Sequence, residues 1–279
     1  MNRVLLGEMN RLVVARAVDF GLYLDGGEMG DILLPTKEAP TPLPAVGDEI
    51  EVFIYLDQEE RLVATSRRPK VMVGGVACLT VAWTNNYGAF MDWGLMKDLF
   101  VPFREQKQKM QKGERHIVHV HLDDTSHRIV ASAKVERYLS REFPPYADGD
   151  AATLLVWHRT PLGYKVIVDG LYTGLLYEDQ VFKPLHTGDT IEGFVKHVRE
   201  DGKIDCILQP TGRRKVTDFS DTLLQRIKDA GGILPLGDKS DAEAIYAAFG
   251  VSKKVFKQTV GALYKQHLIT VEPEKLTLA

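Results

Sequence analysis

An aromatic residue lies on either side of a glycine twice in this sequence, in the pattern aromatic-Gly-x-aromatic. Residues 87–90 read Tyr-Gly-Ala-Phe, and residues 20–23 read Phe-Gly-Leu-Tyr. Exposed aromatic rings can stack on flat ligands, and every nucleobase offers a flat face. Because residues three apart in a regular strand point to opposite faces, we expect Gly88 to bend its strand and bring Tyr87 and Phe90 to one exposed side. The alternative interpretation is ordinary packing in a core or between domains.

Charge is distributed unevenly between the segments that carry these motifs. Residues 1–66 contain 5 Lys or Arg and 12 Asp or Glu, whereas residues 67–140 contain 12 and 7. A polyanion would therefore be repelled by the first segment and attracted by the second. The acidic segment is expected to be a scaffold or protein contact, with Phe20 and Tyr23 as secondary nucleic-acid contacts. The residues expected to bind nucleic acid are Tyr87, Phe90, Lys97, Arg104, Arg115, His119, His121 and Arg128.

No group of residues has the spacing of a catalytic or cofactor-binding motif. The sequence lacks a glycine-rich phosphate loop, a nucleophile elbow and a His-Glu-x-x-His motif, so we expect no enzymatic activity and no cofactor. Its paired acidic residues fall in predicted hairpin turns, where solvated carboxylates are common. His119 and His121 share a strand face, but a metal site would need further ligands, such as Asp123 or His127. Hydrogen-bonded histidines are therefore favoured over a metal site.

The composition is that of an ordinary globular protein. The 279 residues are 44% hydrophobic and 26% charged, with a net charge of −3. This length allows roughly two to four domains. No apolar run reaches the ~18 residues of a membrane span, and the N-terminus is a poor match to a signal peptide. Cys78 and Cys206 each lie in an apolar run and are expected to be reduced, so the chain is predicted to be cytoplasmic without membrane contact.

The aromatic motif belongs to a longer internal repeat. After the motif, each copy continues with a glycine, a long alternating strand, a Leu-Asp turn and a last strand that contains Ala and Ser. Colinear similarity of this length indicates two copies of one structural unit. The matching segments are 20–35 with 87–102, and 45–68 with 111–134.

A weaker third copy follows, in which Leu162 and Lys165 replace the two aromatic residues. Alternating apolar residues and turn signals divide each copy into about five short strands. Five strands within about 70 residues are typical of a small OB-type barrel, whereas a β-sandwich needs more strands. The predicted barrel domains span residues 1–67, 68–143 and 144–212.

The last segment changes from an alternating pattern to a helical one. Its helices are expected to begin at Ser220, Ser240 and Ser252, and glycines follow the first two. Two short strands at the end complete a winged helix over residues 216–279, whose third helix could contact duplex DNA or a protein. Secondary nucleic-acid contacts are expected from Arg213, Arg214 and Lys215 in a basic linker, and from Lys253, Lys254 and Lys257 on the third helix.

The predicted fold class is multi-domain and mainly β, with three tandem S1-like OB-fold barrels followed by an α+β winged-helix domain. The aromatic-Gly-x-aromatic motif and the Gly, Asp and Ser positions after it resemble the S1 RNA-binding domain, in which such an aromatic pair faces RNA. The whole arrangement resembles the conserved virulence factor B family of bacterial RNA-binding proteins. That resemblance implies RNA binding with post-transcriptional regulation and no known enzymatic chemistry.

The sequence thus predicts a protein that binds single-stranded RNA on its second barrel. The bases would stack on Tyr87 and Phe90, and Lys and Arg side chains would contact the phosphates. One alternative is a DNA-binding transcription regulator that acts through the winged helix. Another is a scaffold that recruits protein partners through the winged helix and the acidic first barrel. The charge asymmetry and the sparse lysines of the third helix favour RNA binding.

Overall fold

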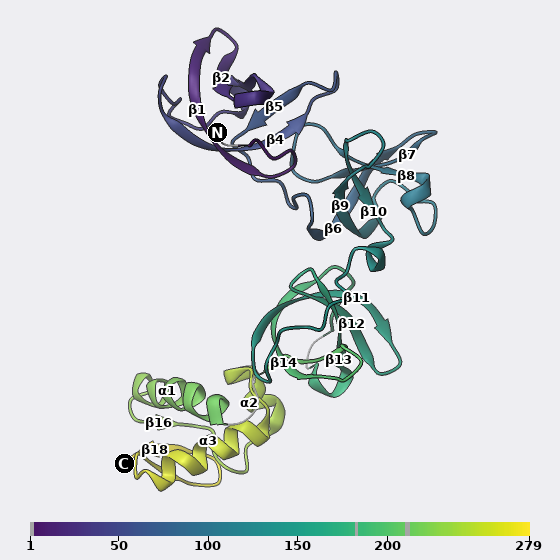
Figure 1. Ribbon diagram of the computed structural model, residues 1–279. Helices are drawn as coiled ribbons and strands as arrows, with labels where there is room; N and C mark the ends of the chain where they lie inside the picture. The colour runs from purple at the N-terminus through teal and green to yellow at the C-terminus, as the bar shows by residue number, and fades with distance from the viewer. Residues whose placement is uncertain (1–2, 182–183, 210–212) are drawn as a thin grey trace. The chain divides into compact units, whose positions relative to one another are not determined.

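The structure is a computed structural model that describes residues 3–181, 184–209 and 213–279, without the side chains of residues 213–218 (Figure 1). The chain divides into two compact units. The first contains the chain up to Pro144 together with residues 153–191 and 201–203, and the second contains residues 145–152, 192–200 and 204–279. None of the described helices is both long and apolar enough to cross a membrane.

Barrel 1 is closed by five strands in the order β1-β2-β3-β5-β4. Alternation along these strands buries one row of side chains, and Leu24, Ile32 and Val52 are completely enclosed. Prolines follow β3, so the connection to β4 contains a single short 3-10 turn and no α-helix. The strands are β1 (Met9–Val18), β2 (Gly21–Asp25), β3 (Asp31–Pro35), β4 (Glu49–Leu56) and β5 (Leu62–Thr65).

Barrels 2 and 3 repeat this topology, which confirms the three predicted OB-like barrels. In each barrel the third and fifth strands are neighbours, as Phe100 and Val130 show for barrel 2, where they pair in parallel. Barrel 2 contains β6 (Val76–Thr84), β7 (Gly88–Asp92), β8 (Leu99–Pro102), β9 (Arg115–Leu122) and β10 (Ile129–Ser132). Barrel 3 contains β11 (Ala151–Thr160), β12 (Gly163–Val168), β13 (Tyr172–Tyr177), β14 (Thr190–Val198) and β15 (Ile204–Ile207).

A β-bulge in the first strand recurs in all three barrels. In β6 the register shifts between Val81 and Trp83, so that Trp83 pairs with Phe90 of β7. Since a bulge changes which side chains share a face, Trp83 leaves the inward row of its strand and joins the face of Phe90. The same shift makes Arg16 pair with Tyr23 in barrel 1 and His158 pair with Lys165 in barrel 3.

The glycine of the motif is required by a close approach of two strands. Gly88 pairs with Pro102 in regular register, and a Cβ atom at Gly88 would collide with the carbonyl oxygen of Val101. Gly21 and Gly163 meet the corresponding carbonyl oxygens in the other two barrels. The expected bend at Gly88 is therefore wrong, because the irregularity lies in the preceding strand.

Barrels 1 and 2 share one hydrophobic core cluster. Phe53 and Tyr55 of β4 pack in the same cluster as Met91 and Trp93 of barrel 2. The rings of Phe53 and Trp93 meet edge to face with 5.6 Å between their centroids. Burial of each large apolar side chain contributes about 1.5–3 kcal/mol, so this cluster fixes β4 and the turn that follows it against barrel 2.

The C-terminal domain is a winged helix, as predicted. Its sheet has the order β16-β18-β17, and its core includes Leu223, Ile227, Ile245 and Phe256. The strand β16 pairs with β18 and was not expected from the sequence. The elements are α1 (Arg213–Asp229), β16 (Ile233–Leu234), α2 (Ala242–Phe249), α3 (Lys253–Lys265), β17 (Ile269–Val271) and β18 (Leu276–Leu278).

Two helix starts differ from the predicted ones. The helix α1 begins at Arg213, before Ser220, because its buried face already includes Phe219 one turn before Leu223. Residues 213–215 are therefore helical and do not form a linker, and their side chains lie outside the described part. At α2 the residue before the helix is Asp241. The hydroxyl of Ser240 does not cap this helix and instead accepts a hydrogen bond from the Gly237 amide.

Candidate nucleic-acid interface

Two stacked aromatic rings, with a third ring tilted against them, lie on the surface of barrel 2. The rings of Trp83 and Phe90 are parallel within 3°, and 3.7 Å separates their centroids. Phe100 of β8 lies beyond Phe90, with 4.9 Å between the two centroids. Phe90 is thus half-buried between two rings, while Trp83 stays 44% exposed at the end of the stack. The free face of the Trp83 indole is the surface that a flat ligand can cover.

Tyr87 lies beside this stack on a hydrogen-bonded turn. The side-chain oxygen of Asn85 accepts hydrogen bonds from the backbone amides of Tyr87 and Gly88, at 2.8 and 3.2 Å. This turn holds the Tyr87 ring in solvent, where it is 75% exposed. The expected Tyr87–Phe90 pair is therefore replaced by an exposed Tyr87 next to a stack that Phe90 forms with Trp83 and Phe100.

A groove of about 640 Å³ runs along this surface. Its lining brings together four of the predicted site residues, namely Tyr87, Phe90, Lys97 and Arg128. Barrel 1 contributes the end of β4 and the following turn. The remaining lining residues include Tyr55, Gln58, Glu60, Trp83, Asn85, Trp93, Met96, Asp98 and Phe100.

The cations of the groove are already in contact with barrel 1. The ammonium of Lys97 donates a hydrogen bond to the backbone carbonyl of Asp57 at 2.7 Å, and Arg128 forms an ion pair with Glu60. Burial lowers the pKa of Lys97, and repulsion by Arg128 lowers it further. The indole of Trp93 donates to the Lys97 carbonyl at 2.6 Å, which fixes the backbone there.

Asp98 holds the end of the aromatic stack in place. Its carboxylate accepts a 2.8 Å hydrogen bond from the indole nitrogen of Trp83. The same carboxylate lines the groove. A negative charge at this position favours hydrogen-bond donors such as base amino groups over phosphate oxygens.

Arg104 and Arg115 lie outside the lining of this groove. Arg104 forms an ion pair with Asp123, and its backbone carbonyl accepts a hydrogen bond from Lys134. Arg115 lines a separate cavity of about 250 Å³, together with residues that include Lys107 and Trp157. The sequence placed both arginines in a basic segment but could not show which side of the barrel each one occupies.

His119 and His121 of β9 also lie outside the groove, where His119 stacks on Tyr138 and His121 packs at a tilt to it. The rings of His119 and Tyr138 are 4.1 Å apart and within 9° of parallel, and the Tyr138 hydroxyl lies 3.2 Å from Nε2 of His121. Burial, with repulsion from His121, lowers the pKa of His119 from 6.5 to about 4. His119 is therefore neutral near pH 7 and packs as an aromatic ring. In the described part of the chain, no group of three or more His, Cys, Asp or Glu side chains could hold a metal ion.

Barrel 1 has the motif but a different surface. Phe20 is 59% exposed, like its counterpart Tyr87, whereas the guanidinium of Arg16 covers the Tyr23 ring at 3.8 Å from its centroid. Arg16 also forms a 3.2 Å ion pair with Asp31. Because Arg16 occupies the position of Trp83, barrel 1 has no equivalent of the aromatic stack.

The lysines of the winged helix are placed at the start of α3. The hydroxyl of Ser252 caps this helix by accepting from the Val255 amide. Lys254 and Lys257 are exposed and Lys253 is half-buried. Lys257 forms a 3.1 Å ion pair with Asp238, so part of its charge is neutralised within the domain.

Comparison with known proteins identifies both kinds of domain. A family described as the S1 domain matches residues 6–67, and one described as the CvfB-like winged helix domain matches residues 221–278. The S1 match falls on barrel 1, the acidic copy of the repeat. S1 and winged helix domains together support nucleic-acid binding by this chain.

Relatives cover most of the chain. The YitL protein of Bacillus subtilis is 28% identical over 269 residues, which are 93% of this chain and 89% of YitL. Conserved virulence factor B of Staphylococcus aureus is 25% identical over 240 residues, covering 84% of this chain and 80% of that protein. The crystal structure of a multidomain protein with nucleic acid binding domains from Streptococcus pneumoniae aligns over 98% of both chains, with 21% identity and a TM-score of 0.41. The chain thus combines an S1 domain with a CvfB-like winged helix domain, and it is similar over most of its length to conserved virulence factor B and YitL.

Proposed function

We propose that this protein binds single-stranded RNA in the groove of barrel 2 and acts as a post-transcriptional regulator, by equilibrium binding and without a catalytic step. The observation that carries the proposal is the stack of Trp83 on Phe90, backed by the tilted ring of Phe100, with Tyr87 exposed beside it in the same groove. Stacking of a base on an aromatic side chain contributes about 1–3 kcal/mol. Trp83 and Tyr87 together would therefore support binding of two unpaired bases.

The groove suits unpaired bases better than a duplex. In a double helix the base faces are stacked on one another, so aromatic side chains can reach them only in single strands, loops or ends. The carboxylates of Asp98 and Glu60 also line the groove, which disfavours a phosphate backbone laid directly along it. These features support a single-stranded ligand whose bases enter the groove.

Fluorescence anisotropy with three labelled ligands tests this proposal. Single-stranded RNA, single-stranded DNA and duplex DNA of equal length are titrated with the wild type and with Tyr87→Ala. The variant is expected to weaken single-strand binding by roughly fivefold or more, the loss that corresponds to one stacked base. The matched control is Phe20→Ala, which removes the equivalent exposed ring from barrel 1, where the aromatic stack is missing, and should weaken binding far less than Tyr87→Ala.

The same titrations decide between the candidate partners. Tighter binding of RNA than of DNA supports the RNA assignment, because a 2′-hydroxyl contact is what distinguishes the two single strands. Tight duplex binding that Tyr87→Ala leaves unchanged would reject the groove and point to the winged helix as a DNA-binding module.

A further inference from the structure

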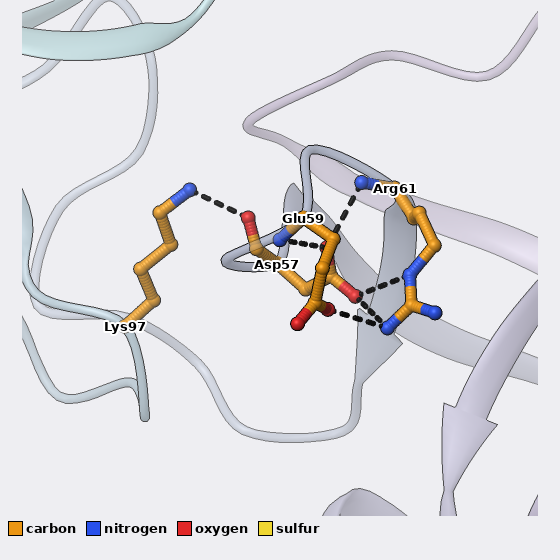
Figure 2. A network of polar contacts seen from close by, with 4 residues as sticks. All are labelled: Asp57, Glu59, Arg61 and Lys97. Carbon is orange, nitrogen blue, oxygen red and sulfur yellow. Dashed lines mark hydrogen bonds and ion pairs between the residues drawn. The ribbon is translucent and has the colours of Figure 1, made fainter.

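The turn that follows β4 in barrel 1, residues 57–61, is a rigid acidic element that faces barrel 2. We call it the acidic turn. One carboxylate oxygen of Asp57 accepts the backbone amides of Glu59 and Arg61, both at 2.9 Å, and the other accepts the Arg61 guanidinium at 2.7 and 2.8 Å (Figure 2). Arg61 also binds Glu59 at 2.6 Å. Arg61, the cation of the acidic turn, is thus bound to Asp57 and Glu59 within the turn. The carboxylate of Glu60 contacts a residue outside the turn.

The acidic turn supplies acceptors to both cations of the groove. As far as the structure describes it, the groove lining contains two Lys or Arg side chains, Lys97 and Arg128. Figure 2 shows Lys97 directed at the backbone carbonyl of Asp57, and the bond measures 2.7 Å. Arg128 pairs with the carboxylate of Glu60. In both contacts the oxygen comes from barrel 1 and the cation from barrel 2.

The acidic turn is held in position, but the ion pair between Glu60 and Arg128 is weak enough to be exchanged. The shared core of Phe53, Tyr55 and Trp93 keeps the acidic turn next to the groove. The side chains of Arg128 and Glu60 are 52% and 51% exposed, and an ion pair this exposed is weak. A phosphate of a bound strand can therefore replace Glu60 on Arg128 without disturbing the core.

We propose that the acidic turn is a built-in competitor of nucleic-acid phosphate: Glu60 and the Asp57 carbonyl occupy the cations of the groove until a bound strand displaces them. This inference rests on the proposed function of the groove and adds its regulation. Barrel 1 thereby makes binding depend more on base stacking, because the contact of a phosphate with Arg128 adds little binding free energy unless the bases also enter the groove. The acidic charge of barrel 1 then acts on ligand selection at barrel 2.

Glu60→Gln and Glu59→Gln form a matched pair for the test. Both remove one negative charge from the same turn, but only Glu60 contacts a groove cation, while Glu59 pairs with Arg61. Glu60→Gln is expected to bind single-stranded RNA roughly two- to fivefold tighter at low salt, the factor that an exposed ion pair supports. Because one more cation is free to meet phosphate, the slope of log K against log salt should steepen by about 0.7. Glu59→Gln should change neither quantity appreciably.

Arg128→Gln completes a double-mutant cycle. In the wild type this change should weaken RNA binding little, because Glu60 already occupies the guanidinium. In the Glu60→Gln background it should abolish the whole gain in affinity and return the salt slope to that of the wild type. Equal tightening by Glu60→Gln and Glu59→Gln would show a net-charge effect alone and overturn the competitor role.

The outcomes separate this inference from the function on which it rests. If Tyr87→Ala weakens RNA binding but Glu60→Gln does not strengthen it, the groove is the binding site and the competitor role is overturned. If neither the wild type nor Glu60→Gln binds RNA in a way that depends on Tyr87, the proposed function is overturned and the inference with it. Tighter, more salt-dependent binding by Glu60→Gln that still requires Tyr87 supports both.

Discussion

Trp83 and Phe90 lie face to face, 3.7 Å apart, because a β-bulge in β6 puts them opposite one another. Without the bulge, Trp83 would share the inward row of Leu79 and Val81, which are both buried. The bulge instead brings the indole to the surface next to Tyr87. A local irregularity of one residue therefore converts a core position into part of the proposed nucleic-acid interface.

Ligand binding should quench the fluorescence of Trp83. The protein has three tryptophans, and Trp93 and Trp157 are 3% and 9% exposed, whereas Trp83 is 44% exposed. A base stacked on the indole quenches its emission, so single-stranded RNA is expected to produce saturable quenching in the wild type. The Trp83→Phe variant should lose this signal. Quenching that persists in Trp83→Phe would place the ligand elsewhere.

The repeated fold could be predicted because its signals are local. Turn residues, alternating apolar residues and the conserved spacing of Gly21 and Gly88 mark five strands per unit, and the structure confirms the three barrels. The sequence predicted less well which residues of barrels 1 and 2 are structurally equivalent. The match of residues 45–68 with 111–134 pairs Ser66 with Ser132. In the structure Thr65 is the counterpart of Ser132, because the turn between the last two strands is one residue longer in barrel 2. A small difference in loop length is easily absorbed by a match between neighbouring Thr and Ser residues.

The site was only partly accessible from the sequence. The motif located Tyr87 and Phe90, and the basic segment suggested Lys97 and Arg128, all of which line the groove. Trp83 was missed because alternation assigns it to the core, and no sequence signal marks a bulge at Ala82. The contribution of barrel 1 could not be seen either, since the contact of Glu60 with Arg128 joins residues 68 positions apart.

Gly88→Ala should destabilise barrel 2. The added methyl group would collide with the backbone carbonyl of Val101, which cannot move without breaking the β7–β8 pairing. A cost of about 1–3 kcal/mol in the free energy of unfolding is expected, as for other overpacked sites. Urea unfolding followed by Trp93 fluorescence measures it. Gly261→Ala in α3, where no atom beyond the adjacent residues and the helix's own backbone lies within 4 Å of the added methyl group, should be neutral or slightly stabilising.

Stability of barrel 2 should fall as the pH falls from 7 to 5. Burial lowers the pKa of His119 from 6.5 to about 4, so the unfolded chain binds a proton at a higher pH than the folded chain does. Neutral His119 contributes fully to the free energy of unfolding above about pH 6.5. This contribution decreases between pH 6.5 and about 4 and is lost below pH 4. The full loss is of order 3 kcal/mol. Urea unfolding at several pH values tests this dependence.

His119→Phe is the control for that pH dependence. Phenylalanine preserves the aromatic contact with Tyr138 but cannot take up a proton. Its unfolding free energy should therefore vary less between pH 7 and 5 than that of the wild type, with the difference attributable to this one side chain. An unchanged pH dependence in His119→Phe would mean that other histidines account for it.

Glu38→Ala should destabilise barrel 1 far more than Glu51→Ala. Glu38 is 2% exposed and accepts a 2.6 Å hydrogen bond from the hydroxyl of Thr65, which is completely buried, so removal of the carboxylate leaves that hydroxyl without its acceptor. The expected cost is about 1–3 kcal/mol. Glu51 is exposed and pairs with Arg68 at 2.8 Å, and such pairs contribute at most about 1 kcal/mol.

The equivalent contact in barrel 2 extends this prediction. Glu105 accepts a 2.6 Å hydrogen bond from the hydroxyl of Ser132, the counterpart of Thr65. If this contact is a shared device that ties the segment after the third strand to the fifth strand, Glu105→Ala should destabilise barrel 2 by an amount similar to the effect of Glu38→Ala on barrel 1. Hydrogen exchange of the Ser66 and Ala133 amides, which donate to the carbonyls of Glu38 and Glu105, reports each barrel separately. Faster exchange at both amides in either single variant would instead show that the two barrels open together through their common core.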